Sequence, residues 1–375
     1  ARRTASVPLE NRLENNKEES DALEEFNTKL LTLNDKVKDF LTLAGNAVKK
    51  SASSSNDDAV HAVAGANALN SSTTLEVLSL ARTATISFAD HFSALDQPVF
   101  AGLAAPAAIS LTVGSGAAAK TLDIEVDAST TLAQLVQKIN QAGSGQVFAS
   151  AINTQTGASP QYILALSGLA AGTENGSLSV NVPPEVQALG LFQNSTVSQA
   201  QDAVLNVAGI GQVRRPGNQI NDLIPGVTLD LKQESTGPVT VSISSDAEKT
   251  AGKVQELVDA VNDLIRYSRE NSIIKRVEDE DTVTNVYGTL ARTRVDDQAI
   301  ESIKTALAGA ISTVTGSAVR SFADLGVTTQ RDGTLSFNKD VFVGAVANNS
   351  AAAEDILQQF SDKLGTANGV IAQYT

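Results

Sequence analysis

The chain has 375 residues, 42% of them hydrophobic and 19% charged, with a net charge of −14, and this length allows two or three domains of about 150 residues each. No apolar run approaches the ~18–20 residues of a membrane span, and an acidic balance without a basic cluster argues against nucleic-acid binding. The absence of Cys excludes disulfides, thiolate metal sites and Cys nucleophiles, and only His61 and His91 provide imidazoles.

A heptad pattern near the start of the chain predicts a long amphipathic helix over residues 9–49. Apolar residues recur there at alternating steps of three and four, and charged residues occupy the opposite positions. The apolar seam consists of Leu23, Phe26, Leu30, Leu33, Val37 and Phe40, continued by Ala44 and Ala47. We expect this helix to end near Gly45 or before the polar run of residues 51–58.

Charge becomes sparse further along the chain, which indicates a second kind of domain. Residues 1–75 contain 9 Lys or Arg and 11 Asp or Glu, whereas residues 96–189 contain only 2 Lys and 6 acidic residues. Loose alternation predicts strands near residues 75–88, 120–126, 227–231 and 239–243. Asn175-Gly176 is a hairpin signal, and turns are expected at Pro216-Gly217 and Ser235-Thr236-Gly237-Pro238.

One short helix is expected among these strands. Ser129 or Thr130 provides its N-cap, and it ends before Gly143. Its apolar face consists of Leu132, Leu135, Val136 and Ile139.

A second long helix is predicted over residues 246–271. Ser245 and Glu248 have the spacing of a capping box, and the apolar residues that follow match the first seam. This second seam consists of Val254, Leu257, Val261 and Leu264. Neither helix can bury its stripe alone, so we expect the two to pair and the chain between them to form an inserted lobe. Packing within one chain is the first interpretation of the seams, and a role in assembly is compatible with it.

The candidates for a metal or catalytic site have simpler explanations. Asp123, Glu125 and Asp127 share one face of a strand and could in principle hold Ca²⁺, but the turn Gly and distal Glu of a calcium loop are missing. His61 or His91 could imitate a triad with Ser and Asp, but no Gly-x-Ser-x-Gly elbow surrounds a candidate Ser. We therefore interpret these residues as solvent-facing polar side chains.

Two further motifs are also interpreted structurally. Gly114-Ser115-Gly116 lacks the rest of a phosphate-binding fingerprint, so we expect a turn there. The acidic run Glu278-Asp279-Glu280-Asp281 is expected to be an exposed loop.

The stretch from Ala200 to Leu231 resembles the signature of flagellar filament cap proteins, the hook-associated protein two family. The residues that carry this resemblance are Asp202, Ala203, Gly209, Asn218, Ile220, Gly226, Val227, Thr228, Leu229 and Leu231. Residues 258–262 and 325–335 are similar to later family elements, and residues 121–140 to an inserted module shared with flagellins. Ala208 departs from the family, which usually has Asn before the following Gly.

The resemblance implies an α+β multidomain fold. A discontinuous, coiled-coil-like helical domain, residues 1–75 and 246–375, would carry two nested and mainly β domains. The first β domain would comprise residues 76–95 and 190–245, and the inserted outer β domain residues 96–189. Segments that the family usually has at both ends are absent, and the chain lacks Met, so we expect an excised or processed piece.

The function implied by the resemblance is structural, not enzymatic, and it requires no cofactor. Such a subunit oligomerises at the filament tip and promotes flagellin polymerisation. Its implied partners are further copies of itself, flagellin, hook–filament junction proteins and an export chaperone, with no nucleic acid and no membrane span. It would lie outside the cell, at the flagellum tip, after export through the flagellar channel. The alternatives are another flagellar axial protein, either flagellin or a junction protein, or a surface adhesin.

Overall fold

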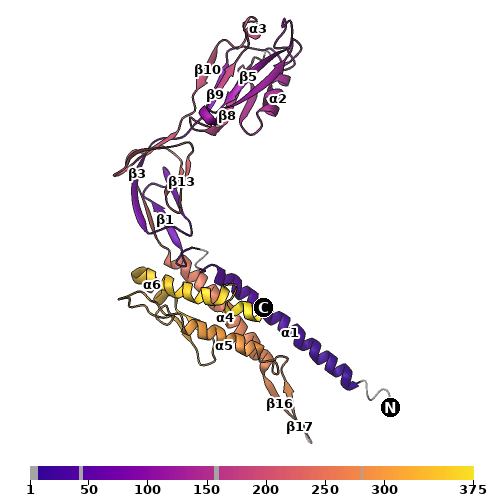
Figure 1. The fold of residues 1–375 in the computed structure, drawn as a ribbon, viewed down its shortest axis with the longest axis vertical. Helices are drawn as coiled ribbons and strands as arrows, with labels where there is room; N and C mark the ends of the chain where they lie inside the picture. The colour runs from indigo at the N-terminus through magenta and orange to yellow at the C-terminus, as the bar shows by residue number, and fades with distance from the viewer. Residues whose placement is uncertain (1–6, 42–44, 156–159, 280–281) are drawn as a thin grey trace. The chain divides into compact units, whose positions relative to one another are not determined.

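The computed structural model describes residues 7–41, 45–155, 160–279 and 282–375, and it contains both helices and sheets (Figure 1). The chain forms two compact units. One contains residues 1–51, 64–70 and 243–375, and the other contains residues 52–63 and 71–242. The first unit is mainly helical and the second mainly β, so the mixed fold class predicted from the sequence is confirmed at this level.

The helical unit is a bundle whose core draws residues from all five of its helices named here. Its helices are α1 Val7–Lys38, α4 Ala247–Ser272, α5 Val295–Ala308, α6 Lys339–Gly365 and α7 Val370–Tyr374. Its two antiparallel hairpins are formed by β16 Ile274–Asp279 with β17 Thr282–Tyr287, and by β18 Val327–Thr329 with β19 Leu335–Phe337. One hydrophobic core joins residues of α1, α4, α5, α6 and α7, because each helix has a single apolar stripe that only its neighbours can cover.

Helix α1 ends at Lys38, so its predicted extension to residue 49 is wrong. Phe40 and Ala47 are nevertheless buried in the helical core, and they reach it from irregular backbone. Gly45 has a φ of +98°, and a Cβ there would collide with the backbone of Ala66, so the chain turns where only Gly fits. The seam position Ala44 lies outside the described residues.

The N-cap of α4 is Asp246, and the predicted capping box of Ser245 and Glu248 is wrong. The Asp246 carboxylate accepts a hydrogen bond from the Lys249 backbone N–H at 2.8 Å. Ser245 is the last residue of β15 (Val239–Ser245), and Glu248 instead forms an ion pair with Lys339. A carboxylate one position later fits better, because it both caps the helix and complements its positive end.

The mainly β unit contains two sheets whose first strands lie within residues 1–75, which the sequence analysis assigned to the helical domain. These strands, β1 and β2, start at Lys50 and Val60. The five-stranded sheet has the order β1-β15-β3-β11-β12, with β1 Lys50–Ser54, β3 Ser71–Ser79, β11 Ala203–Val207 and β12 Gly211–Arg215. The three-stranded sheet has the order β13-β14-β2, with β13 Gln219–Ile224, β14 Val227–Leu231 and β2 Val60–Ala64. The predicted strands at 227–231 and 239–243 therefore lie in different sheets.

Two more sheets and a helix enclose a second core, which we call the outer core. A four-stranded sheet has the order β10-β4-β8-β7, with β4 Thr83–Phe88, β7 Val147–Asn153, β8 Tyr162–Ala171 and β10 Ser195–Ser198. A three-stranded sheet has the order β6-β5-β9, with β5 Ala107–Val113, β6 Lys120–Val126 and β9 Leu178–Asn181. Helix α2 Leu132–Ala142 packs on this core, and two single turns, η2 Gly116–Ala118 and α3 Pro184–Gln187, connect strands.

The buried residues of the outer core run from Ala84 to Ala200. Strand β4 thus pairs with β8 and β10 pairs with β4, although the sequence analysis assigned the residues of β4 and β10 to the first β domain. Arg82 and Gln201 exchange two backbone hydrogen bonds, of 2.8 and 3.1 Å, directly outside this core. The chain therefore enters and leaves this part of the fold at one point.

Two local predictions in the same region are also corrected. The N-cap of α2 is Thr131, which forms a capping box with Gln134, while Ser129 and Thr130 bond to Asp127 instead. Asn175-Gly176 is in a turn but does not form a hairpin, because β8 and β9 belong to different sheets.

The packing of α1 on α4 leads to the first testable prediction. Leu33 and Leu257 are 0% and 3% exposed in the shared core, so changing either to Ala should lower the free energy of unfolding by roughly 2–5 kcal/mol. Leu31→Ala is the matched control on α1, because Leu31 is 47% exposed and its loss should cost less than about 0.5 kcal/mol. Chemical denaturation measures all three, and equal stability of the core variants and the control would refute the pairing.

Candidate interaction surface

The structure brings the two predicted seams together in one core. On α1, Phe26, Leu30, Leu33 and Val37 are buried, and on α4 so are Val254, Leu257, Val261 and Leu264. Leu23 is only half-buried, because the buried position in its turn of the helix is taken by Ala22. The seams are therefore buried within the chain, and any surface for a partner must lie beside them.

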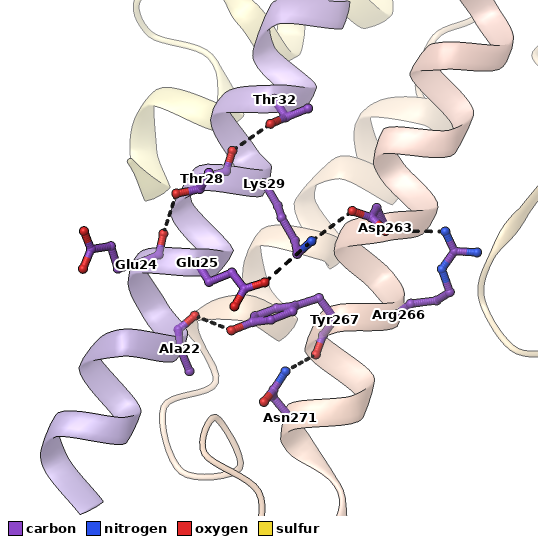
Figure 2. Close-up of polar contacts among 10 residues, drawn as sticks. All are labelled: Ala22, Glu24, Glu25, Thr28, Lys29, Thr32, Asp263, Arg266, Tyr267 and Asn271. Atoms are coloured by element: carbon purple, nitrogen blue, oxygen red, sulfur yellow. Dashed lines mark hydrogen bonds and ion pairs between the residues drawn. The ribbon is translucent and has the colours of Figure 1, made fainter. Parts of the chain in front are cut away.

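A polar cluster flanks the seam on one side (Figure 2). The Lys29 ammonium of α1 lies 3.0 Å from the Asp263 carboxylate of α4 and 3.9 Å from Glu25 of its own helix. The hydrogen bond that Lys29 donates lowers the pKa of Asp263, and the charge of Arg266, 3.5 Å away, adds to this. These contacts fix which turn of α1 faces which turn of α4.

Tyr267 closes the lower part of this cluster (Figure 2). Its hydroxyl donates to the backbone carbonyl of Ala22 at 3.0 Å, and the Lys29 ammonium lies 5.3 Å from its ring centre. Burial raises the pKa of the Tyr267 hydroxyl, and the nearby charge of Glu25 raises it further. The hydroxyl therefore remains a donor at neutral pH. The sequence analysis missed Asp263 and Tyr267, although both flank the predicted seam one helical turn apart.

A second ion cluster lies nearer the end of α1. Lys36 forms an ion pair with Glu256 at 2.9 Å, and Lys253 lies 3.4 Å from Glu256 and 3.5 Å from Asp39. The hydrogen bond from Lys36 lowers the pKa of Glu256. Some of the charged residues that flank the α1 seam thus join α1 to α4.

The N-terminal part of α1 differs from the rest of the helix. Residues 12–21 contain no buried side chain, and Leu13 is 75% exposed. Continuing the seam backwards by alternating steps of four and three leads to Glu19, Asn16 and Arg12, all polar. This segment, which we call the α1 extension, has no buried side chain, and on one side Asn15, Glu18 and Glu19 line a pocket with residues 285–289 and Arg292.

The residues of the family-like signature have structural roles. Asn218 bonds to both the backbone N–H and the carbonyl of Ala81, at 2.7 and 3.0 Å. Gly209 and Gly226 have φ values of +79° and +74°, which allow the turns of the β11–β12 and β13–β14 hairpins. Asp202 accepts a hydrogen bond from the Thr173 backbone N–H at 2.7 Å. Of the remaining signature residues, Ala203, Ile220, Val227, Leu229 and Leu231 are buried and Thr228 is half-buried.

Two family-like elements that are distant in the chain contact each other in the helical unit. The Asn262 amide of α4 donates to the Leu335 carbonyl at 2.8 Å and accepts from the Leu335 N–H at 2.7 Å. Residues 258–262 and 332–335 are thereby joined by a pair of bonds that a shorter or non-polar side chain could not make. No spacing rule in the sequence links these positions.

The other candidate sites do not assemble into a reaction centre. Hydrogen bonds from Ser129 and then Thr130 lower the pKa of Asp127, and the described residues contain no group of three or more His, Cys, Asp and Glu suited to a metal. The His61 imidazole lies 2.7 Å from Asp57, and this hydrogen bond, together with that from Lys232, lowers the pKa of Asp57. His91 is exposed.

Of the last two sequence motifs, one lies in a turn and the other lies partly in a strand. The Ser115 hydroxyl of the Gly114-Ser115-Gly116 motif donates to the carbonyls of Thr173 and Glu174. The hydroxyl is thus used in hydrogen bonds within the chain. Glu278 and Asp279 belong to strand β16 and not to a loop, while Glu280 and Asp281 lie outside the described residues. In the part of the chain that the structure describes, no helix is sufficiently long and apolar to cross a membrane.

Comparisons with known proteins agree on one family. The family model for the flagellar hook-associated protein 2 N-terminus matches residues 1–84, and that for its C-terminus matches residues 200–375, so together they cover more than two thirds of the chain. The A-type flagellar hook-associated protein 2 of Pseudomonas aeruginosa is 26% identical over 77% of this chain and 62% of its own length. The B-type protein of P. aeruginosa PAO1 is 28% identical over 92% of this chain and 71% of its own length.

A solved structure shares the fold. The crystal structure of the flagellar cap protein FliD D1-D2-D3 domains from Escherichia coli has a TM-score of 0.72, is 21% identical, and covers 94% of this chain and 98% of that one. The chain therefore has the same overall fold as that structure.

The ion pairs between α1 and α4 predict a dependence on pH. Because the folded pKa of Asp263 is lowered, its contribution to stability is complete above its ordinary value of about 3.9 and is lost as the pH falls through the lower folded value. Lys29→Met should reduce this loss, so its unfolding free energy should fall less steeply as the pH drops below about 4.

At pH 7 the same variant should lose no more than about 1 kcal/mol, because the Asp263 side chain is 55% exposed. Lys17→Met, on the α1 extension, is the control that should retain the pH dependence of the parent. Denaturation of the three proteins across this pH range measures the effect. An unchanged slope for Lys29→Met would show that the Lys29–Asp263 pair does not couple the helices.

Proposed function

The chain belongs to the flagellar hook-associated protein 2 family, and on that premise we propose that it is a subunit of a flagellar filament cap. In this proposal it is a structural protein that binds copies of itself at the filament tip and promotes flagellin polymerisation there. The single observation that carries the proposal is the match of the family's N-terminal and C-terminal models to the two ends of the chain, on either side of the outer core.

The proposed architecture is a discontinuous, coiled-coil-like helical domain with two nested β domains. The alternating seam of α1 supports the coiled-coil character, and the discontinuous helical unit supports the first insertion. The outer core supports the second, because its residues lie between Arg82 and Gln201, which bond to each other. We keep the proposed boundaries at residues 75 and 245, and we move those at 95 and 189 to about 83 and 200.

We propose that ring contacts between subunits use the helical domain, residues 1–75 and 246–375, and the α1 extension in particular. A helical segment of this length has only marginal stability in water unless another element packs against it. Contact of a partner with the polar face that continues the seam would therefore stabilise the segment. Glu18 and Lys17 place charges of both signs there, which suits a specific and reversible contact. Lys36 and Lys38 are less suitable contact residues, because they form ion pairs with Glu256 and Asp35 of the same chain.

The partners and location follow from the same proposal. Besides copies of itself, the subunit would contact flagellin and hook–filament junction proteins and would use an export chaperone, acting outside the cell at the flagellum tip. Assignment as flagellin, a junction protein or an adhesin is not favoured, because the matching relatives and family models carry the hook-associated protein 2 name. No reaction or cofactor is proposed.

The nested architecture can be tested by deletion. Replacing residues 83–200 with a short Gly/Ser linker should leave the helical domain folded, because Arg82 and Gln201 already lie within hydrogen-bond distance. Helical circular dichroism and a cooperative unfolding transition should both be retained. Loss of the helical signal would contradict an autonomous outer domain.

The assembly proposal predicts a closed ring or plate of few subunits for the full-length protein, seen by electron microscopy and weighed by mass measurement. Charge reversal at Glu18 of the α1 extension should weaken this ring, whereas Glu185→Lys, at an exposed residue of the outer part, should not. A strict monomer at high concentration would refute the cap assignment, and an open filament would favour flagellin.

A further inference from the structure

One face of the four-stranded sheet β10-β4-β8-β7 is free of charge. The register places Phe148 opposite Ser167, Ser167 opposite Thr85, and Thr85 opposite Ser198, so these four side chains form one row across the sheet. Parallel rows complete the same face. Its residues are Phe148, Ser150 and Ile152 on β7, Ile163, Ala165 and Ser167 on β8, Thr85 and Ser87 on β4, and Thr196 and Ser198 on β10. We call this set the neutral face.

The neutral face lies on the side of the sheet away from the outer core. Residues of the alternate parity, such as Ile86, Leu164 and Leu166, are buried in that core. Phe148 and Ile152 are 54% and 47% exposed, and every other member of the face is exposed or half-buried. The solvent-facing side of a sheet normally carries polar and charged residues. An uncharged face with exposed Phe and Ile is instead typical of a surface that a partner covers.

The edge of the sheet beside this face is partly closed to another strand. The Asn140 amide of α2 donates to the Ala149 carbonyl at 3.0 Å and accepts from the Ala149 N–H at 2.7 Å. The neighbouring Val147 N–H donates to the Gly143 carbonyl. These bonds occupy outward-pointing backbone groups of β7 that an added strand would need. At the β7 edge, a partner is therefore expected to contact the side chains of the face and not to extend the sheet.

The charge of the chain indicates what that partner is. Each copy carries a net charge of −14, so contact between two copies costs least at surfaces that carry no charge of their own. The neutral face is also self-complementary in size, since large Phe148 and Ile152 lie on β7 at one side of the sheet and small Thr85 and Ser198 lie toward the other. We propose that this face binds the neutral face of a second copy of the chain, which places large residues over small ones.

The size of the face sets the strength of the contact. Four strands at ~4.8 Å spacing and about five residues of ~3.3 Å each give a face on the order of 300 Å². A standard stable interface buries ~800 Å² on each partner, so the pair is weak and forms at high protein concentration. A face-to-face pair has two-fold symmetry and is complete with two copies, so it is separate from the ring contact proposed for the α1 extension.

Single-cysteine crosslinking of the whole chain tests this pairing directly, because the chain has no Cys of its own. Ser150→Cys, on the neutral face, should form covalent dimers with a short bis-maleimide as concentration rises. Gln137→Cys, exposed on α2, is the control and should form at least 10-fold fewer. Equal crosslinking at the two positions, or none at residue 150, would overturn the proposal.

A charge placed on the face provides the second measurement. Phe148→Lys should weaken dimerisation at least 10-fold in sedimentation equilibrium, whereas Gln137→Lys adds the same charge elsewhere and should have no effect. Unchanged thermal unfolding shows that both variants are folded, as the exposure of Phe148 leads us to expect. Dimerisation of Phe148→Lys equal to that of the parent would contradict the proposal. The full-length Phe148→Lys variant should still form rings like the parent, so the cap proposal stands independently of the pairing proposal.

Discussion

The rest of the structure depends on the pairing of α1 with α4. Each helix has one apolar stripe, and residues more than 200 positions apart, such as Lys36 and Glu256, must come together before either stripe is covered. The chain between them therefore leaves the helical unit and returns to it. Its strands can vary in length and packing without disturbing the seam, because the β unit has hydrophobic contacts of its own. A seam built from distant segments thus requires the chain between them to leave the helical unit and return to it.

Apolar contacts alone would allow the two helices to slide by one turn, and the polar residues beside the seam oppose this. Lys29 meets Asp263, and Tyr267 donates to the carbonyl of Ala22, so a shifted register would leave these groups without partners. Lys36 and Glu256 repeat the arrangement further along. Exposed ion pairs add little stability each, so their contribution here is to the choice of register.

Sequence patterns predicted elements well where one periodicity acted alone, and less well where several local signals competed. The strand 120–126 and the seam of α1 follow directly from alternation and heptad spacing. The ends of helices did not, because Asp246 and Thr131 compete with neighbouring Ser and Thr residues that could also cap. The bond between Asn262 and Leu335 joins elements that no local pattern connects, so only the folded chain reveals it.

Native-state hydrogen exchange tests the central role of the seam most directly. If α1 and α4 form one cooperative structure, amides near Leu33 and Leu257 should exchange with the same free energy, equal to that of global unfolding of the helical unit. Amides of the α1 extension should exchange with a much smaller free energy in the isolated subunit, since its side chains are not buried. Exchange near Leu33 through a lower-energy opening that leaves α4 protected would contradict the account.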